Sequence, residues 1–166
     1  FSYFKIIPQK YLNKSKVNLV PHESNLPQGK GMSPLSWQIL NDKNEIFFSL
    51  IEADSKLDSG VVYYKKKVVI PKTYLFDDIK KIQFNENLKL IIKFIKFYKK
   101  FKKKPKFTIQ KGISTYYKRR SPKDSELSIK KNLYDQFNLL RINDNKNYPS
   151  FFKIYGKKFF IKIYKE

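Results

Sequence analysis

The residues best suited to chemistry are the chain's only histidine, His22, and an aspartate that follows it at Asp58. An apolar run at 17–20 leads to His22, and the loop behind it is rich in Pro and Gly. A second apolar run precedes Asp58, which opens an Asp-Ser-Gly turn. Active sites are often built where strands deliver side chains to one edge of a sheet, and imidazole can accept a proton near neutral pH. The pattern therefore points to acyl-transfer chemistry.

Both features also have an ordinary structural interpretation. A lone histidine beside a loop is commonly a hydrogen-bonded surface or core residue, and function does not follow from its presence. Asp-Ser-Gly is a common turn sequence, because Asp and Gly suit turn geometry. The residue types alone leave the two interpretations open.

Hydrophobic periodicity predicts the elements that would position these residues. Ser33 is placed to cap a helix that has Pro34 in its first turn. Pro105 and the basic run before it mark a boundary between a catalytic part, 1–104, and a small C-terminal part, 105–166. Strands are expected at 2–6, 17–20, 46–52, 61–70 and 107–109, helices at 34–41, 87–104 and about 127–141, and a hairpin at 151–163 that turns at Gly156.

Composition limits the classes of function. The chain has 36 Lys and Arg against 14 Asp and Glu, a net charge of +22, and no cysteine. Such charge with interleaved aromatics is typical of nucleic-acid binding, although an A+T-rich genome would enrich Lys, Asn, Ile, Tyr and Phe in any protein. Without cysteine there is no disulfide scaffold or thiolate metal site. One histidine without a close carboxylate cluster argues against a metal centre.

The sequence predicts a cytoplasmic chain with no membrane insertion. No run approaches the roughly 18–20 apolar residues of a spanning helix, and no signal peptide is visible. The segment 87–104 comes closest to a membrane-attaching helix, because Leu88, Ile92 and Ile95 recur at helical spacing between lysines. We expect it to be a core-facing helix with a solvated lysine face.

The order of the motifs resembles that of the folate-dependent formyltransferases. His22-Glu-Ser-Asn-Leu-Pro27 matches the family's His-x-Ser-x-Leu-Pro, and a Gly-rich continuation, a helix, a strand and Leu57-Asp-Ser-Gly60 follow in the family's order. The resemblance implies transfer of a formyl group from 10-formyltetrahydrofolate to an amine. It also implies an α/β fold, the C-terminal part of a Rossmann-like domain followed by a small α+β tail with a β-hairpin. Because the family has a further half-sheet before this point, we expect the chain to be N-terminally truncated.

Matching the motifs assigns roles to individual residues. His22 would relay the amine proton and stabilise the oxyanion, and Asp58 would orient the imidazole. The family's oxyanion-donating asparagine, two residues before its histidine, is Val20 here. Asn18 lies four residues before His22, on the same side of an extended strand, and is the expected substitute. The alternatives are that a backbone N–H or another side chain holds the oxyanion, or that this chain has impaired activity. The expected contacts to the folate are Lys5, Ile6, Ile7, Asp54, Ser55, Lys56 and Leu57.

Later segments at 116–125, 138–141 and 148–152 resemble the sugar-modifying branch of the family. The resemblance implies a nucleotide-linked amino sugar as acceptor, for polysaccharide biosynthesis, and leaves a homodimer open. Methionyl-tRNA is the alternative acceptor, but about 60 residues after Pro105 are too few for the β-barrel of that branch. From a different class, the chain is a truncated relic or a basic RNA-binding module.

Overall fold

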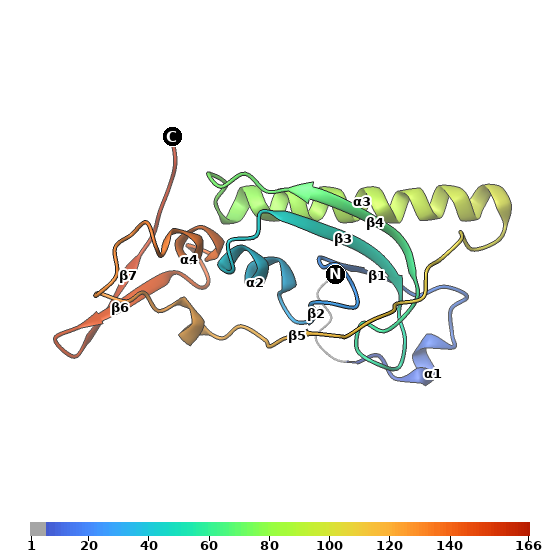
Figure 1. The fold of residues 1–166 in the computed structure, drawn as a ribbon, viewed down its shortest axis with the longest axis horizontal. Helices are drawn as coiled ribbons and strands as arrows, with labels where there is room; N and C mark the ends of the chain where they lie inside the picture. The colour runs from blue at the N-terminus through green and yellow to red at the C-terminus, as the bar shows by residue number, and fades with distance from the viewer. Residues whose placement is uncertain (1–5) are drawn as a thin grey trace.

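The computed structural model describes residues 6–166 (Figure 1). Its centre is an antiparallel sheet in the order β1 (Leu19–His22), β3 (Glu45–Glu52) and β4 (Val62–Val69). The helix α3 (Phe76–Phe101) runs along one face of this sheet, and α2 (Pro34–Leu40) lies near its end. The remaining elements are α1 (Gln9–Leu12), β2 (Lys30–Gly31), β5 (Tyr116–Tyr117), the 3₁₀ helix η1 (Pro122–Ser125), α4 (Phe137–Ile142), β6 (Ser150–Ile154) and β7 (Lys157–Ile161).

The main core lies between the sheet and α3. Alternate residues of β3, Ile46, Phe48 and Leu50, are fully buried, because side chains two apart on a strand share a face. Leu90 and Phe94, one turn apart on α3, pack into the same cluster. Burial of each such side chain is worth about 1.5–3 kcal/mol. This packing fixes the sheet that carries β1.

The tail is joined to this core through α4. Ile142 packs into the main cluster, and the side chain of Arg141 is fully buried. The Arg141 guanidinium donates to the carbonyl of Pro71 at 3.1 Å and to the side-chain oxygen of Asn44 at 3.3 Å. Residues after 105 therefore satisfy polar groups and fill space in the first part of the chain.

The sequence predicted the regular parts of the fold well. The strands expected at 46–52 and 61–70, the helix at 34–41 and the C-terminal hairpin are confirmed, with their ends shifted by one or two residues. The hairpin turns at Tyr155 and Gly156, both with positive φ, as two-residue hairpin turns require. The strand expected at 17–20 is found two residues later and ends on His22.

Several expected helix and strand boundaries were wrong. α3 begins at Phe76 rather than at residue 87, because the Asp78 side chain accepts the N–H of Leu75 and starts the helix early. Ser33 has a left-handed φ of 54° and no side-chain cap bond, so its capping role was wrong. The segment 107–109 forms only one bridge, between Thr108 and Val62.

The helix expected at about 127–141 is reduced to α4. The Gln136 side chain donates to the carbonyls of Ser128 and Asn132 and accepts the N–H of Ser128, which favours turns before α4. The strand expected at 2–6 lies outside the described residues except for Ile6, which belongs to no strand. Within residues 6–166, no helix combines the length and the apolar character needed to cross a membrane.

Candidate active site

β1 carries His22 to the edge of the sheet. Among residues 6–166 the strand pairs with β3 only, and its Pro21 lies opposite Leu50. Proline is tolerated in such an edge strand, because its missing N–H is not needed for a second ladder. His22 ends the strand opposite Ser49 and is only 5% exposed.

His22 and Asp58 come together from two separate segments. The Nδ1 atom of His22 lies 3.7 Å from Oδ2 of Asp58, which is an electrostatic contact rather than a hydrogen bond. Its Nε2 atom donates to the carbonyl of Gly29 at 2.8 Å, since a carbonyl can only accept. The same Oδ2 of Asp58 accepts the N–H of Gly31 at 2.8 Å. In a protonated ring, the Nε2–H would thus face the carbonyl of Gly29 and the Nδ1–H would face the carboxylate of Asp58.

Three side chains from three elements hold the residues that follow His22. Asn87 of α3 donates to the carboxylate of Glu23 at 2.6 Å, and Gln38 of α2 donates to the carbonyl of Glu23 at 2.6 Å. Ser49 of β3 donates to the carbonyl of Ser24 at 2.8 Å. All five residues are buried. Sequence reasoning missed this network, because its partners are far apart in the chain and share no motif.

The turn that carries Asp58 is held by Gln110. Its side-chain nitrogen donates to the carbonyls of Asp58 and Gly60, each at 2.8 Å. Asp58 itself has a left-handed φ of 47°. At Gly60, a Cβ would overlap the carbonyl oxygen of Glu52, so only glycine fits where the turn passes β3. Gln110 was also absent from the predicted site.

Gly31 allows a close approach between two short strands. Its φ is +95°, and a Cβ there would overlap the carbonyl oxygen of Tyr117, with which Gly31 pairs. Glycines in such a loop can let it pass close to a ligand or can simply form turns. In the structure, Gly31 instead brings β2 close to β5, and this places its N–H on Asp58.

The expected oxyanion donor is engaged elsewhere in this structure. The side-chain amide of Asn18 donates to the carbonyl of Leu12 at 2.9 Å, and its backbone N–H donates to Glu52. Val20 packs beside the buried side chains of Leu26 and Ile51 and offers no polar group. The role of Asn18 stays a prediction, and it would require the bond to Leu12 to break.

The expected folate contacts fall into two groups. Lys5 lies outside the described residues, Ile6 is exposed and Ile7 is half-buried. The segment 54–57 is an exposed loop that leads to Asp58. Within it, the carboxylate of Asp54 accepts the Ser55 N–H at 2.6 Å and the Ser59 hydroxyl at 3.2 Å, and these bonds hold the pKa of Asp54 below its usual value. Both groups stay predicted contacts to the folate.

Glu52 sits where β3 enters this loop. Burial would raise the pKa of its carboxyl, but hydrogen bonds from the Tyr63 hydroxyl, Lys104 and the Asn18 N–H outweigh burial and lower it. Lys104 lies 3.0 Å from the carboxylate. The ionised Glu52 thus joins β3, β4 and the segment after α3 close to the site.

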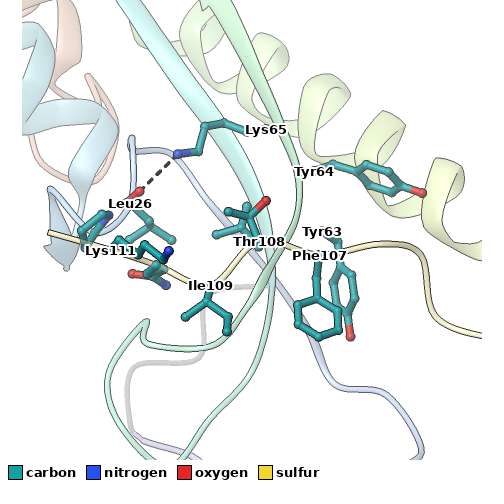
Figure 2. A pocket seen from close by; sticks show the side chains of 11 residues that line it. Leu26, Tyr63, Tyr64, Lys65, Phe107, Thr108, Ile109 and Lys111 are labelled. Atoms are coloured by element: carbon teal, nitrogen blue, oxygen red, sulfur yellow. Dashed lines mark hydrogen bonds between the residues drawn. The ribbon is translucent and has the colours of Figure 1, made fainter.

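An open pocket of about 750 Å³ adjoins the site (Figure 2). Leu26 of the loop after His22 lines one side, and Tyr63 and Phe107 stand together on another. Lys65 donates to the carbonyl of Leu26 at 3.1 Å. Neither His22 nor Asp58 lines the pocket, but Gln110 does, so one side chain contacts both the pocket and the Asp58 turn.

The sequence is similar to two kinds of curated formyltransferase. It is 37% identical over 62 residues to methionyl-tRNA formyltransferase from Pelagibacter ubique, a match that covers 37% of this chain and 20% of the relative. It is 31% identical over 74 residues to GDP-perosamine N-formyltransferase from Brucella melitensis, covering 43% of this chain and 28% of the relative. The matches thus span less than a third of these curated relatives. No protein-family model matches the chain.

The structural similarity extends over nearly the whole chain. A 4-N formyltransferase from Francisella tularensis superposes with a TM-score of 0.77 at 21% identity, over 98% of this chain and 67% of that one. HypX from Aquifex aeolicus, solved in complex with tetrahydrofolic acid, gives a TM-score of 0.76 at 17% identity, over 96% of this chain and 27% of HypX. The fold is therefore that of the formyltransferases, which confirms the expected fold class. The sequence matches, over 37–43% of the chain, are also to formyltransferases.

Proposed function

We propose that this chain carries the catalytic centre of an enzyme that moves a formyl group from 10-formyltetrahydrofolate to the amine of a nucleotide-linked amino sugar. The observation that carries the proposal is the meeting of His22 and Asp58 at 3.7 Å. They come from separate segments, and each sits in the motif that resembles the family's. An imidazole beside a carboxylate, held by buried hydrogen bonds, suits proton transfer.

The reaction needs one base and one group that stabilises an oxyanion. The amine nitrogen attacks the formyl carbon, a new C–N bond forms, and the carbonyl oxygen becomes an oxyanion. The bond between that carbon and the folate nitrogen then breaks, the amine loses a proton and the folate nitrogen gains one. His22 relays this proton, and Asp58 orients the ring and stabilises its charged form. During this step the hydrogen bond from Nε2 of His22 to the carbonyl of Gly29 must break, so that Nε2 can contact the substrate.

The donor site we propose is the exposed loop 54–57 together with Ile6 and Ile7. Asp54 turns its carboxylate into its own loop, so backbone groups of the loop are left to contact a pterin. The similarity of the fold to HypX, which was solved with tetrahydrofolic acid, supports a folate donor. A nucleotide-linked amino sugar as acceptor is supported by the similarity to GDP-perosamine N-formyltransferase.

Methionyl-tRNA is the second candidate acceptor. A specific observation favours it, since the Pelagibacter methionyl-tRNA formyltransferase is 37% identical over the stretch that it matches. The charge of +22 would also attract a polyanion such as tRNA. The chemistry at His22 and Asp58 is the same for either acceptor, because both present an amine.

A formyl-transfer assay tests the proposal. The protein is expressed from the longest reading frame that contains this chain and is given 10-formyltetrahydrofolate with a panel of nucleotide-linked amino sugars and initiator methionyl-tRNA. We expect His22→Ala and Asp58→Asn to lower kcat by about 10²–10⁴-fold, the usual contribution of acid–base catalysis. Asp77→Asn, a change of the same type at an exposed helix position, is the control. Full activity in His22→Ala would refute the proposed role of His22.

A further inference from the structure

One stretch of the chain supplies most of its net positive charge. Between Glu86 and Asp124 the sequence has 14 lysines and arginines and no acidic residue, so this stretch supplies +14 of the net +22. A general bias toward lysine raises the number of lysines everywhere, but it does not remove acidic residues from one stretch. The charge excess is therefore a local feature that a biased genome composition does not explain.

Four of these lysines lie without acidic partners near the end of α3. Among the described residues, Lys89 forms an ion pair with Glu86 on α3, and Lys104, which follows the end of α3, forms one with Glu52. Across residues 6–166, no carboxylate lies within ion-pair distance of Lys96, Lys99, Lys100 or Lys103. Their charge is available to an external anion.

Two apolar side chains are exposed among these lysines. Ile92 and Ile95 are 41% and 43% exposed, whereas Leu90 and Phe94 are buried against the sheet. Residues three apart share one face of a helix, so Ile92 and Ile95 form a second apolar patch, on the side of α3 away from the sheet. Figure 1 shows α3 on the outside of the sheet, in agreement with this exposure.

We propose that this part of α3 docks on a membrane surface rich in anionic lipid. The docking surface consists of Ile92, Ile95, Lys96, Lys99, Lys100 and Lys103. Its lysines contact lipid phosphates, and its isoleucines enter the boundary between head groups and acyl chains, as in amphipathic helices that lie in the interface plane. Lys96, Lys99 and Lys100 lie on α3 and Lys103 follows its end, and a cluster of four basic residues is enough for electrostatic attraction to anionic lipid. The inference does not depend on formyl transfer.

Lipid fits this surface better than RNA does. Both are anionic, and both would be attracted by the lysines. Single-stranded nucleic acid gains much of its affinity by stacking bases on exposed aromatic rings. Two exposed aromatic side chains, Phe101 at the end of α3 and Phe107 beyond it, lie next to this surface rather than at its centre. The apolar groups at its centre, Ile92 and Ile95, are aliphatic and cannot stack with a base. They can be removed from water by a bilayer interface, which favours burial of apolar area.

The test is co-sedimentation of the purified chain with vesicles of phosphatidylcholine alone or with a third of phosphatidylglycerol. We expect binding only to the anionic vesicles. A lysine near an anionic surface contributes about 1 kcal/mol, so Lys96→Gln, Lys99→Gln and Lys103→Gln together should lower the affinity roughly 100-fold. The matched control removes three charges elsewhere, with Lys130→Gln, Lys131→Gln and Lys157→Gln, and should change the affinity much less.

A second variant separates lipid insertion from simple charge attraction. Ile92→Gln with Ile95→Gln keeps every charge and lies on an exposed face, so the fold is expected to persist, as circular dichroism would verify. Loss of vesicle binding in this variant supports insertion. Equal effects of the two lysine triplets would overturn the proposal, because binding would then follow net charge alone. Binding of single-stranded RNA that needs Lys96, Lys99 and Lys103 but not the isoleucines, with no vesicle binding, would overturn the proposal in favour of RNA.

Discussion

Replacing Gly31 by alanine tests how the approach of β2 to β5 supports the site. Gly31 and Gly112 have similar positive φ angles, +95° and +102°, but different surroundings. A Cβ on Gly31 would overlap the carbonyl oxygen of Tyr117 and lie 3.3 Å from that residue's carbonyl carbon and nitrogen. Around Gly112 nothing lies within 4 Å. Gly112→Ala is therefore a matched control that changes the backbone preference without a clash.

The expected costs follow from these surroundings. Gly112→Ala costs about 1–2 kcal/mol, the penalty for an L-residue in a left-handed conformation. Gly31→Ala has the same cost and also separates β2 from β5. This breaks the bonds from the N–H of Lys30 to Thr115 at 2.9 Å and from the N–H of Met32 to Tyr117 at 3.1 Å, at about 1 kcal/mol each. The total is about 3–4 kcal/mol, or a fall in Tm of roughly 6–16 °C against roughly 2–8 °C for the control.

Urea unfolding followed by tryptophan fluorescence measures the difference. Trp37 is the only tryptophan and stacks on Tyr117 with ring centroids 6.4 Å apart, so it reports on the affected region. Because the N–H of Gly31 also donates to Asp58, the variant should lose formyl transfer even where it remains folded. Equal destabilisation by the two substitutions would refute the reasoning that contact with Tyr117 sets the cost.

Three further predictions concern the groups around the site. Tyr63→Phe removes the hydroxyl that donates to Glu52 and should cost about 1–2 kcal/mol in urea unfolding, because a bond to a charged group is lost while two others remain. The pKa of Glu52 is lowered in the folded chain, so ionised Glu52 stabilises the fold fully above the unfolded-state pKa. This stabilisation is lost as the pH falls through the folded-state pKa. The difference in unfolding free energy between wild type and Glu52→Gln, measured from pH 7 down to pH 3, should therefore shrink below about pH 4.5. Asn87→Leu leaves the buried Glu23 carboxylate without its donor and should cost about 2–3 kcal/mol, and a Glu23→Leu partner substitution should recover part of this in a double-mutant cycle. If the double variant lost as much unfolding free energy as the sum of the two single variants, the hydrogen bond from Asn87 to Glu23 would not stabilise the fold.

Local patterns in the sequence predicted the regular elements well. β3 was predicted because apolar residues dominate the stretch between its polar ends. The C-terminal hairpin was predicted because Gly156 lies between two segments rich in apolar residues. The proximity of His22 and Asp58 was also predictable, since each follows an apolar strand and the two strands flanking Asp58 pair with each other. These features depend on residues that are close in sequence.

The rest depends on contacts between distant residues, which local patterns do not encode. Nothing near Asn87 or Gln110 indicates that their amides would hold the loops of His22 and Asp58, because their partners lie more than 50 residues away. Asn18 was expected to donate to the oxyanion near His22, because both residues lie on the same side of an extended strand. Its bond to Leu12 arises from the way the preceding segment folds back, which the strand pattern did not reveal.

The buried guanidinium of Arg141 has a consequence for how the chain unfolds. It fixes the tail to Pro71 and Asn44, and the neighbouring Ile142 fills part of the main core. Withdrawing the tail would leave the carbonyl of Pro71 without this donor and open a cavity beside β3. We therefore expect the segments before and after Pro105 to melt in a single cooperative transition, with one calorimetric peak, and neither to survive limited proteolysis as a folded fragment without the other.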